Sequence, residues 1–349
     1  MKAVVIGASG NIGTALLRSL RVAEPGCEVV GVCRRPPIHR PPYDTATWHA
    51  LDAADPNSAE PLARICSGAD VVLSMAWLIQ PSHDERAMYR TNVEGTTRVV
   101  QTAARAGVGQ LIYLSSIGAY SPASGDSPVD ESWPTGGIPT SSYSRHKAVV
   151  ETMLDGIEQE YPTMVVSRIR PALVMQRAAA TEIMRYFIGP LVPRVAFTAA
   201  CRGRLPVVPL PRQLTLQFVH ADDVADAISR VLHRRAGGAF NLAADPAMTA
   251  ATLAALLGKR HVHVQPGLVR AALQVSWVLR LQPTSPGWWD LALGSPVMRC
   301  SRAHTELGWR PRWTSEQALG DLLGGLAGGS GGISPPLLPR KSTVPDIAT

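Results

Sequence analysis

Three glycines directly follow the first apolar run of the chain, and they restrict what its N-terminal part can form. The run at residues 3–6 is rich in β-branched side chains and reads as a strand, and Gly7, Gly10 and Gly13 come immediately after it. A helical pattern at residues 14–22 follows the loop. Glycines between a strand and a helix allow a tight turn and a close approach of the backbone to a pyrophosphate. The spacing G-x-x-G-x-x-G therefore predicts a dinucleotide-binding β-α unit.

Further strand-like runs alternate with helical patterns along the first half of the chain. We expect strands at residues 28–33, 47–51, 70–75, 110–114, 164–169 and 239–243. This alternation is typical of an α/β fold, a Rossmann-type doubly wound parallel sheet. After Pro171 the pattern becomes irregular, and the residues after 245 are mostly helical, which predicts a smaller, mostly helical C-terminal substrate lobe.

The domain boundaries follow from these changes of pattern. We expect a dinucleotide-binding domain at 1–176, to which 216–243 returns with a helix from Phe218 to about His233. The segments 177–215 and 244–326 would form the substrate lobe. Residues 327–349 are rich in Gly, Ser and Pro and are expected to be a flexible tail.

Composition limits the compartment and the partners. The 349 residues are 46% hydrophobic, and five cysteines stand far apart without a C-x-x-C motif, which favours reduced thiols in the cytoplasm and no metal site. The net charge of +7 comes from arginines along the chain rather than from a basic block, so no nucleic acid partner is expected. The apolar stretch 268–281 contains two arginines and is too short to span a bilayer. Its tryptophan and the pair Trp288-Trp289 are attributed to core or pocket packing, so no membrane partner is expected.

The end of the second strand predicts the cofactor. A carboxylate at this position usually binds the adenosine ribose of NAD, whereas an arginine accommodates the 2′-phosphate of NADP. Here Arg34 and Arg35 follow the strand and no carboxylate is available, so we expect NADP, with NAD as the alternative. The other interpretation is that both arginines are merely exposed after a strand.

An acid/base pair is indicated by Tyr143 and Lys147. Four residues apart on a helix, they share one face. A phenol has a pKa of about 10, and a neighbouring ammonium would lower it towards the range useful at neutral pH. Ser115 and Ser116 end a predicted strand upstream of this pair.

These motifs, in this order from Met1 to about Leu326, resemble the extended short-chain dehydrogenases/reductases, the NAD(P)-dependent epimerase/dehydratase family. The resemblance rests also on Asn92-Val-Glu-Gly95, on Arg170-Pro171 and on Phe218-Val-His220. It implies that Tyr143 is the general acid/base, that Lys147 binds the nicotinamide ribose, that Ser116 hydrogen-bonds the reacting oxygen and that Ser115 faces away. The cofactor-binding residues that it implies are Gly7, Ser9, Gly10, Asn11, Ile12, Gly13, Arg34, Arg35, Asp52, Ala76, Asn92, Lys147, Pro171 and Leu173. Asp52 as a turn residue and Asn92 as a helix cap are the structural alternatives.

The histidines are interpreted structurally. His220 stands before Asp222 and Asp223 at a helix start, where it is expected to be an N-cap rather than a metal ligand. His261 and His263 alternate on what reads as a short surface strand. The resemblance is compatible with a homodimer but does not predict one.

Departures from the family narrow the reaction. Sugar-nucleotide 4,6-dehydratases carry acidic residues shortly after the active-site hydroxyl, whereas this chain has Ile117-Gly118-Ala119-Tyr120, so a 4,6-dehydratase is not expected. Sugar-nucleotide members also place an arginine where Leu216 stands. Six arginines of the lobe could compensate: Arg177, Arg185, Arg194, Arg202, Arg204 and Arg212.

The leading hypothesis is an NADP-dependent oxidoreductase that transfers hydride at a secondary alcohol or ketone of a small metabolite. Because the substrate lobe has an apolar sequence, this metabolite can be apolar. A nucleotide-sugar 4-epimerase and a non-catalytic NADP-binding sensor are the alternatives. The complete Ser116, Tyr143 and Lys147 set favours an enzyme over the sensor.

Overall fold

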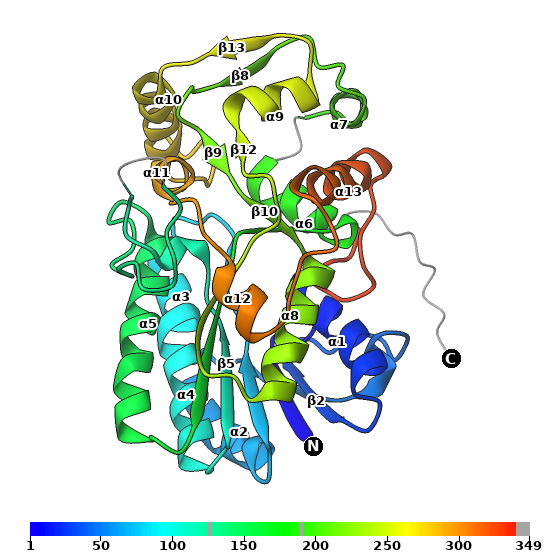
Figure 1. Cartoon of the computed structure of the whole chain (residues 1–349), viewed down its shortest axis with the longest axis vertical. Helices are drawn as coiled ribbons and strands as arrows, with labels where there is room; N and C mark the ends of the chain where they lie inside the picture. The colour runs from blue at the N-terminus through cyan, green and yellow to red at the C-terminus, as the bar shows by residue number, and fades with distance from the viewer. Residues whose placement is uncertain (124–126, 189–191, 340–349) are drawn as a thin grey trace.

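Seven parallel strands form the main sheet of the protein in the computed structural model, which describes residues 1–123, 127–188 and 192–339 (Figure 1). Their order is β11-β6-β5-β4-β1-β2-β3. The strands are β1 (Lys2–Ile6), β2 (Glu28–Cys33), β3 (Ala46–Ala50), β4 (Val71–Ser74), β5 (Gln110–Leu114), β6 (Val165–Pro171) and β11 (Gly238–Leu242). This order reverses between β1 and β4, as in doubly wound sheets, and confirms the predicted fold class.

Helices cover both faces of the sheet because its strands are apolar on both sides. In β1, Ala3 and Val5 belong to the core under one layer, and Val4 and Ile6 belong to the core under the other. Helices α1 (Asn11–Ala23) and α8 (Ala221–Arg234) pack together on the first face. The second face is covered by α2 (Ala59–Cys66), α4 (Thr96–Arg105) and α5 (Ser142–Glu160), which Figure 1 shows on the opposite side from α1 and α8.

A smaller lobe lies beyond the carboxyl ends of the strands (Figure 1). It contains three two-stranded pairs and a separate apolar core around Phe197, Phe218 and Leu322. Its strands are β7 (Leu173–Met175), β8 (Val208–Leu210), β9 (Thr215–Leu216), β10 (Phe218–His220), β12 (Met248–Thr249) and β13 (His261–His263). Its helices are α6 (Ala180–Ile183), α7 (Arg194–Cys201), α9 (Ala250–Leu257), α10 (Pro266–Val278), α11 (Pro286–Gly294) and α13 (Ser315–Gly328). Two more short helices are α3 (Glu85–Tyr89), after β4, and α12 (Ser301–Glu306), which packs on β11.

The helix expected from Phe218 is shorter than predicted. Residues Phe218–His220 form β10, which pairs in parallel with β7, and α8 begins only at Ala221. His220 is the N-cap of α8, and its Nδ1 accepts a hydrogen bond from the Asp222 backbone at 3.2 Å. This confirms the structural interpretation of His220.

Other polar residues also have structural partners. Both carboxylate oxygens of buried Asp223 accept backbone hydrogen bonds, from Arg312 at 2.9 Å and from Trp313 at 3.1 Å, which ties α8 to the segment before α13. His261 and His263 lie on β13 with ring centroids 4.2 Å apart. Among the described residues, no group of three His, Cys, Asp or Glu could hold a metal ion.

The C-terminal segment differs from the expected flexible tail. Helix α13 continues to Gly328, and beyond it the Thr181 hydroxyl donates to the Ser330 carbonyl at 2.8 Å. Ser334 and Leu337 are fully buried. The expected tail is therefore packed against the protein as far as it is described, and residues 340–349 lie outside the described residues. None of the helices described here is long and apolar enough to cross a membrane.

Candidate active site

A cavity of about 600 Å³ lies between the carboxyl ends of the main strands and the smaller lobe. The residues proposed from the sequence converge on it. All of the expected catalytic and cofactor-binding residues line this cavity except Asn92. Segments far apart in the sequence, from the β1-α1 loop to Pro336, contribute to its wall.

The glycine loop fits a bound pyrophosphate. Gly7 has a φ of +91°, and a Cβ there would lie 2.7 Å from the Ala76 backbone nitrogen. A Cβ on Gly13 would lie 2.6 Å from the Gly7 carbonyl oxygen. Gly10 is the N-cap of α1 and provides no capping side chain, so the unpaired backbone N–H groups at this helix end are free for an anion. The loop therefore has the close packing and the donors that a dinucleotide needs.

The part of the cavity at the carboxyl end of β2 contains Arg34 and Arg35, which follow this strand and are both exposed. Asp52 lines the same end, and its carboxylate also accepts a hydrogen bond from the Ala54 backbone at 3.0 Å. Asp52 thus has the turn role that was the structural alternative, and it is still open to the cavity.

Asn92 does not line the cavity and is not a helix cap. It is buried in the π-helical turn Arg90–Gly95. Its side chain accepts a hydrogen bond from the Leu78 backbone N–H at 2.7 Å and donates to the Leu78 carbonyl at 3.0 Å. Leu78 lines the cavity, so Asn92 fixes a part of the cavity wall without lining it itself.

Tyr143 lies in the first turn of α5, and Gly118 gives its ring the space to approach the end of β5. A Cβ on Gly118 would lie 2.9 Å from the Tyr143 ring. The Ser116 hydroxyl accepts a hydrogen bond from the Gly118 backbone at 3.0 Å and lines the cavity with Tyr143. The chain thus brings the two hydroxyls expected to bind the reacting oxygen to one side of the cavity.

The pKa of Tyr143 in the structure differs from the value expected for a phenol beside the Lys147 ammonium. Burial raises the pKa of Tyr143 to about 12, and the interaction with Ser116 only partly opposes this rise. Lys147 donates to the Leu114 carbonyl at 2.7 Å, and its ammonium lies 3.5 Å from the centroid of the Trp77 ring. The same ammonium is 6.0 Å from the centroid of the Tyr143 ring. The predicted lowering of the Tyr143 pKa by Lys147 is therefore not found, because the ammonium is held by other partners.

Lys147 is itself strongly perturbed. Burial holds its pKa well below the usual range, and the negative charge of Glu151 partly opposes this effect. The ammonium also donates to the Tyr113 hydroxyl at 3.3 Å. Aromatic faces and a carbonyl replace the water around this cation.

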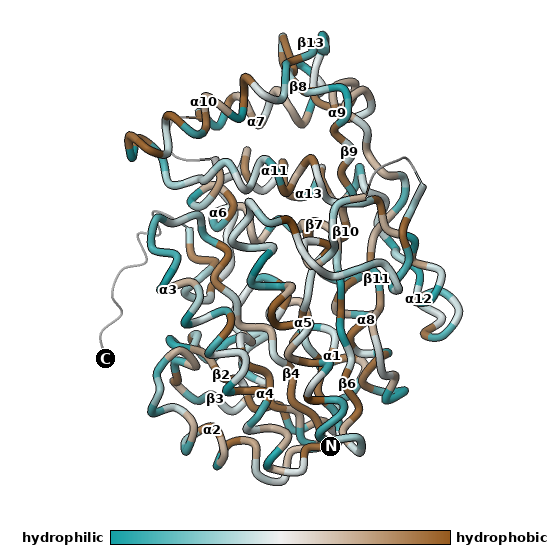
Figure 2. The backbone as a smooth tube through the Cα atoms, turned by 90° about the vertical axis from the view of Figure 1, so that its left-hand side faces the viewer, coloured by the Kyte–Doolittle hydropathy of each residue, from teal (hydrophilic) through white to brown (hydrophobic). Residues whose placement is uncertain are grey.

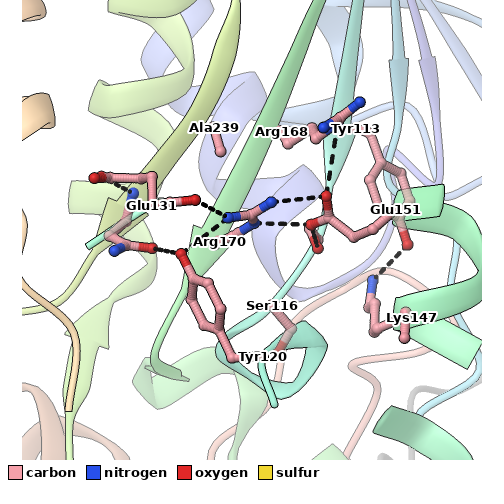
Figure 3. A network of polar contacts seen from close by, with 12 residues as sticks. Tyr113, Ser116, Tyr120, Glu131, Lys147, Glu151, Arg168, Arg170 and Ala239 are labelled. Carbon is pink, nitrogen blue, oxygen red and sulfur yellow. Dashed lines mark hydrogen bonds and ion pairs between the residues drawn. The ribbon is translucent and has the colours of Figure 1, made fainter. Parts of the chain in front are cut away.

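A buried network of charged and polar side chains lies next to Lys147 (Figure 3). Glu151 lies one helical turn further along α5, and its carboxylate accepts two hydrogen bonds from the Arg170 guanidinium, both of 2.9 Å. The Ser115 hydroxyl donates to the same carboxylate at 2.5 Å, so Ser115 points to the network and away from Tyr143, as expected. Arg170 also donates to the Tyr120 hydroxyl at 3.0 Å. The network joins α5 to β5 and β6 next to Pro171.

Aromatic side chains form the other end of the cavity. The Tyr143 ring lies 6.0 Å from Trp77 and 5.2 Å from Trp288, and Phe187 lies 5.0 Å from Trp288, measured between ring centroids. The sequence did not identify Phe187 as a site residue, since it belongs to no motif. From the sequence, Trp288 was assigned only to core or pocket packing. Its position in a Trp-Trp pair was the one feature of the sequence that could have indicated a site residue.

Basic side chains are few around the cavity. Among the described lining residues they are Arg34, Arg35 and Lys147. Leu216 lines the cavity at the position where an arginine was noted as missing, and none of the six lobe arginines lines it. Two of those six have other partners: Arg177 pairs with Asp321 at 3.2 Å, and Arg185 donates to the Pro336 carbonyl.

One acidic residue of the cavity was not foreseen. Glu182 on α6 lines the cavity, and burial raises the pKa of its carboxyl to about 7. Arg185 only partly opposes this shift. Nothing in the sequence around Glu182 distinguished it from a solvated helix residue.

The C-terminal segment closes one side of the cavity. Pro335 and Pro336 line it, and the Ser334 hydroxyl donates to the carbonyl of Ser9 in the glycine loop at 2.8 Å. This contact joins residues 325 positions apart in the chain.

The Rossmann sheet, the glycine loop at a helix N-terminus and the shared cavity define the class of dinucleotide-binding α/β proteins. Residues 3–243 match the model of the NAD dependent epimerase/dehydratase family. The chain belongs to this family.

Individual proteins are also similar to this chain. An uncharacterized protein of Mycobacterium tuberculosis, Rv2047c, is 26% identical over 324 residues, which are 92% of this chain but only 30% of that protein. The sterol-4-alpha-carboxylate 3-dehydrogenase of Saccharomyces cerevisiae is 29% identical over 131 residues, 37% of this chain and 36% of the enzyme. The structure of Thermus thermophilus UDP-glucose 4-epimerase in complex with NAD superimposes with a TM-score of 0.66 at 20% identity, covering 94% of this chain and 99% of that one. At this identity the structural likeness shows the fold.

Proposed function

We propose that this protein is an NADP-dependent oxidoreductase that transfers hydride at a secondary alcohol or ketone of a small apolar metabolite. The observation that carries the proposal is the single cavity that Ser116, Tyr143 and Lys147 share with the glycine loop and with a wall of aromatic side chains. In this proposal the cofactor binds along the glycine loop, so a substrate carbonyl held against the aromatic wall would be next to both hydroxyls.

The chain's own residues suggest how a ketone is reduced. The bound dinucleotide supplies the hydride at its nicotinamide ring. Tyr143 is protonated at neutral pH because its pKa is about 12, so its hydroxyl can donate a proton to the carbonyl oxygen as negative charge develops there. The Ser116 hydroxyl donates a second hydrogen bond to the same oxygen. Trp77, Trp288 and Phe187 exclude water and strengthen these interactions.

The cofactor preference is proposed from Arg34 and Arg35. Both line the cavity at the adenosine end, where a guanidinium can pair with a 2′-phosphate in a bidentate manner. We expect NADPH to bind more tightly than NADH, and the double variant Arg34→Ala/Arg35→Ala to lose this difference. Arg40→Ala is the matched control, because Arg40 is exposed on the same loop and does not line the cavity. Equal dissociation constants of the unchanged protein for the two cofactors would contradict the assignment.

The substrate class is proposed from the lining of the cavity. A nucleotide sugar carries a pyrophosphate that needs basic clamps, and the described lining has basic side chains only at the adenosine end and beside Tyr143. The yeast relative, which matches part of this chain, is named as a dehydrogenase of a sterol carboxylate, a substrate with a large apolar ring system. The absence of a carboxylate at 117–120 is the reason that we do not propose a sugar 4,6-dehydratase.

A nucleotide-sugar 4-epimerase is the second candidate, favoured by the fold of the Thermus enzyme. The two reactions differ in their cofactor balance, since an epimerase returns its hydride and consumes no NADPH. The test is NADPH oxidation with a panel of alicyclic and steroidal ketones, run beside UDP-hexose epimerisation. Epimerisation without any NADPH oxidation would refute the proposed oxidoreductase.

A third candidate is a non-catalytic NADP-binding sensor in the cytoplasm, in which the contact of Lys147 with Trp77 is structural only. Tyr143→Phe separates this candidate from an enzyme. In an enzyme, the variant abolishes NADPH oxidation and leaves the affinity for NADPH nearly unchanged. In a sensor, turnover is absent before and after the substitution.

A further inference from the structure

Helix α10 is an apolar helix without a single buried residue. Its thirteen residues include eight apolar side chains of Ala, Val, Leu and Trp, yet all of its residues are partly or largely exposed. Figures 1 and 2 place it at the outer edge of the smaller lobe, away from the main sheet. In a globular protein, the apolar stripe of a helix normally faces the core.

One face of α10 is attached to the protein. Arg270 pairs with Asp290 of α11 at 2.8 Å, and the Trp289 indole donates to the Pro266 carbonyl at 3.2 Å. The Trp277 ring stacks on His83 with centroids 4.8 Å apart. These contacts fix the orientation of the helix, so its other face is presented outward.

The outward face is a continuous apolar surface. Residues three or four apart share one side of a helix, and here this side carries Leu268, Ala271, Val275 and Val278. Leu279 and Leu281 extend it past the end of α10. The Leu and Val members of this set are 58 to 75% exposed. We call these residues the α10 face, and contiguous exposed apolar surface of this kind marks an interaction site.

The sequence segments that contain α10 and β8 carry charge of one sign, although Asp290 of α11, just beyond them, pairs with Arg270. Residues 192–215 and 246–289 contain eight lysines and arginines and not one aspartate or glutamate. The remaining twenty-six basic residues are balanced by twenty-seven acidic ones, so the whole positive excess of the chain is located in these two segments. The net positive charge, which looked evenly spread along the sequence, is therefore concentrated in these two segments. Exposed members are Arg194, Arg202, Arg204, Arg212, Lys259, Arg260 and Arg280. The first three lie on or directly after α7, which Figure 1 shows on the other side of the lobe from α10.

The strands connect these two segments in space. β13 pairs with β8, so the loops carrying Lys259 and Arg212 flank one small sheet, and α10 begins three residues after β13. A second copy of the chain would bring like charges together at this surface. An anionic lipid surface offers both a negative charge for the cations and an apolar layer for the side chains.

We propose that the α10 face docks onto the surface of a membrane that contains anionic lipids. The leucines and valines of this face insert at the boundary of the headgroups and acyl chains, and Arg280 together with Arg212, Lys259 and Arg260 beside the β8-β13 pair bind lipid phosphates. This proposal replaces the expectation, drawn from the sequence, of no membrane partner. It does not depend on the proposed reaction. Helix α11 contacts α10 and contributes Trp288 and Leu291 to the cavity, so docking places the cavity one helix away from the lipid.

The test is co-sedimentation of the full chain with vesicles of phosphatidylglycerol and phosphatidylcholine, and with vesicles of phosphatidylcholine alone. We expect binding to the anionic vesicles that weakens at high salt. Val275→Glu/Leu279→Glu should weaken binding by about a hundredfold, because each inserted side chain contributes about a tenfold factor. Val22→Glu is the matched control, since Val22 is 83% exposed on α1 in the other half of the molecule. Circular dichroism checks that the variants are folded.

Three results would overturn the proposal. The first is no binding to vesicles of either composition. The second is vesicle binding that Val275→Glu/Leu279→Glu leaves unchanged, because attraction by charge alone does not use the α10 face. The third is a dimer in analytical ultracentrifugation that this double variant dissociates while vesicles are not bound, because the face would then hold a second copy.

Discussion

Replacing Glu151 by glutamine removes the negative charge at the centre of the buried network in Figure 3. The Glu151 side chain is 1% exposed and the Arg170 side chain 4% exposed, so neither is screened by water. Glutamine keeps the volume but has only one oxygen acceptor, and its NH₂ group would face the guanidinium, which now donates two hydrogen bonds to Glu151. Breaking one partner of a buried pair leaves an uncompensated charge and costs about 3 to 5 kcal/mol.

Urea denaturation measures this loss as the change in the free energy of unfolding. The control is Glu60→Gln. Glu60 forms an ion pair with Arg64 in which the two side chains are 81% and 70% exposed, so this substitution should lower the free energy of unfolding by at most about 0.5 kcal/mol. A loss below about 1 kcal/mol for Glu151→Gln would refute the inference that the network stabilises the fold. Because Glu151 raises the pKa of Lys147, the variant should also lower that pKa further and shift the pH profile of NADPH oxidation towards lower pH.

Three further predictions concern the cavity. Glu182→Gln should match the unchanged protein in stability below about pH 4.5 and exceed it by about 1 to 3 kcal/mol near pH 8. The reason is that the raised pKa of about 7 keeps this carboxyl protonated in the native state while the unfolded state already ionises, so stability is lost as the pH rises from about 4.5 to about 7. Thermal unfolding across this pH range measures the difference. Asn92→Ala should weaken NADPH binding about tenfold in a fluorescence titration, because the Leu78 backbone loses two hydrogen bonds. Ser334→Ala should speed NADPH dissociation about fivefold in stopped-flow fluorescence, because the bond to the Ser9 carbonyl is lost.

Each of these predictions has a result that contradicts it. Parallel stability curves of Glu182→Gln and the unchanged protein would show that this carboxyl ionises normally. Unchanged NADPH affinity in Asn92→Ala would mean that the loop at Leu78 keeps its position without the amide. An unchanged dissociation rate in Ser334→Ala would separate the C-terminal segment from cofactor release.

The sequence was sufficient for elements defined by local pattern. The apolar runs that became β1 and β2 were found within a residue, because a buried parallel strand needs a continuous run of β-branched side chains. β10 was missed because its three residues are strand only by pairing with β7, more than forty positions earlier. Tertiary contacts, not local preference, decide such short elements.

For the candidate site, the sequence predicted the residues that belong to motifs but not the contacts that depend on tertiary packing. The spacing of Tyr143 and Lys147 places them on one side of α5, but spacing cannot show that Trp77 and the Leu114 carbonyl hold the ammonium. Phe187 was missed because it occurs in no motif. Its place beside Trp288 depends on how two segments about one hundred residues apart pack together.

The C-terminal segment has a consequence for inferring function from relatives. The match to the family ends at residue 243, whereas the wall of the cavity is completed by α11 and by Pro335 and Pro336. Proteins that align with this chain only over the earlier part cover the positions that we propose for hydride and proton transfer. They need not share the residues of the last hundred positions that line the cavity. Substrate assignments should therefore be transferred only between homologues that keep the last hundred residues, and truncated expression variants that end near 326 would lack part of the pocket.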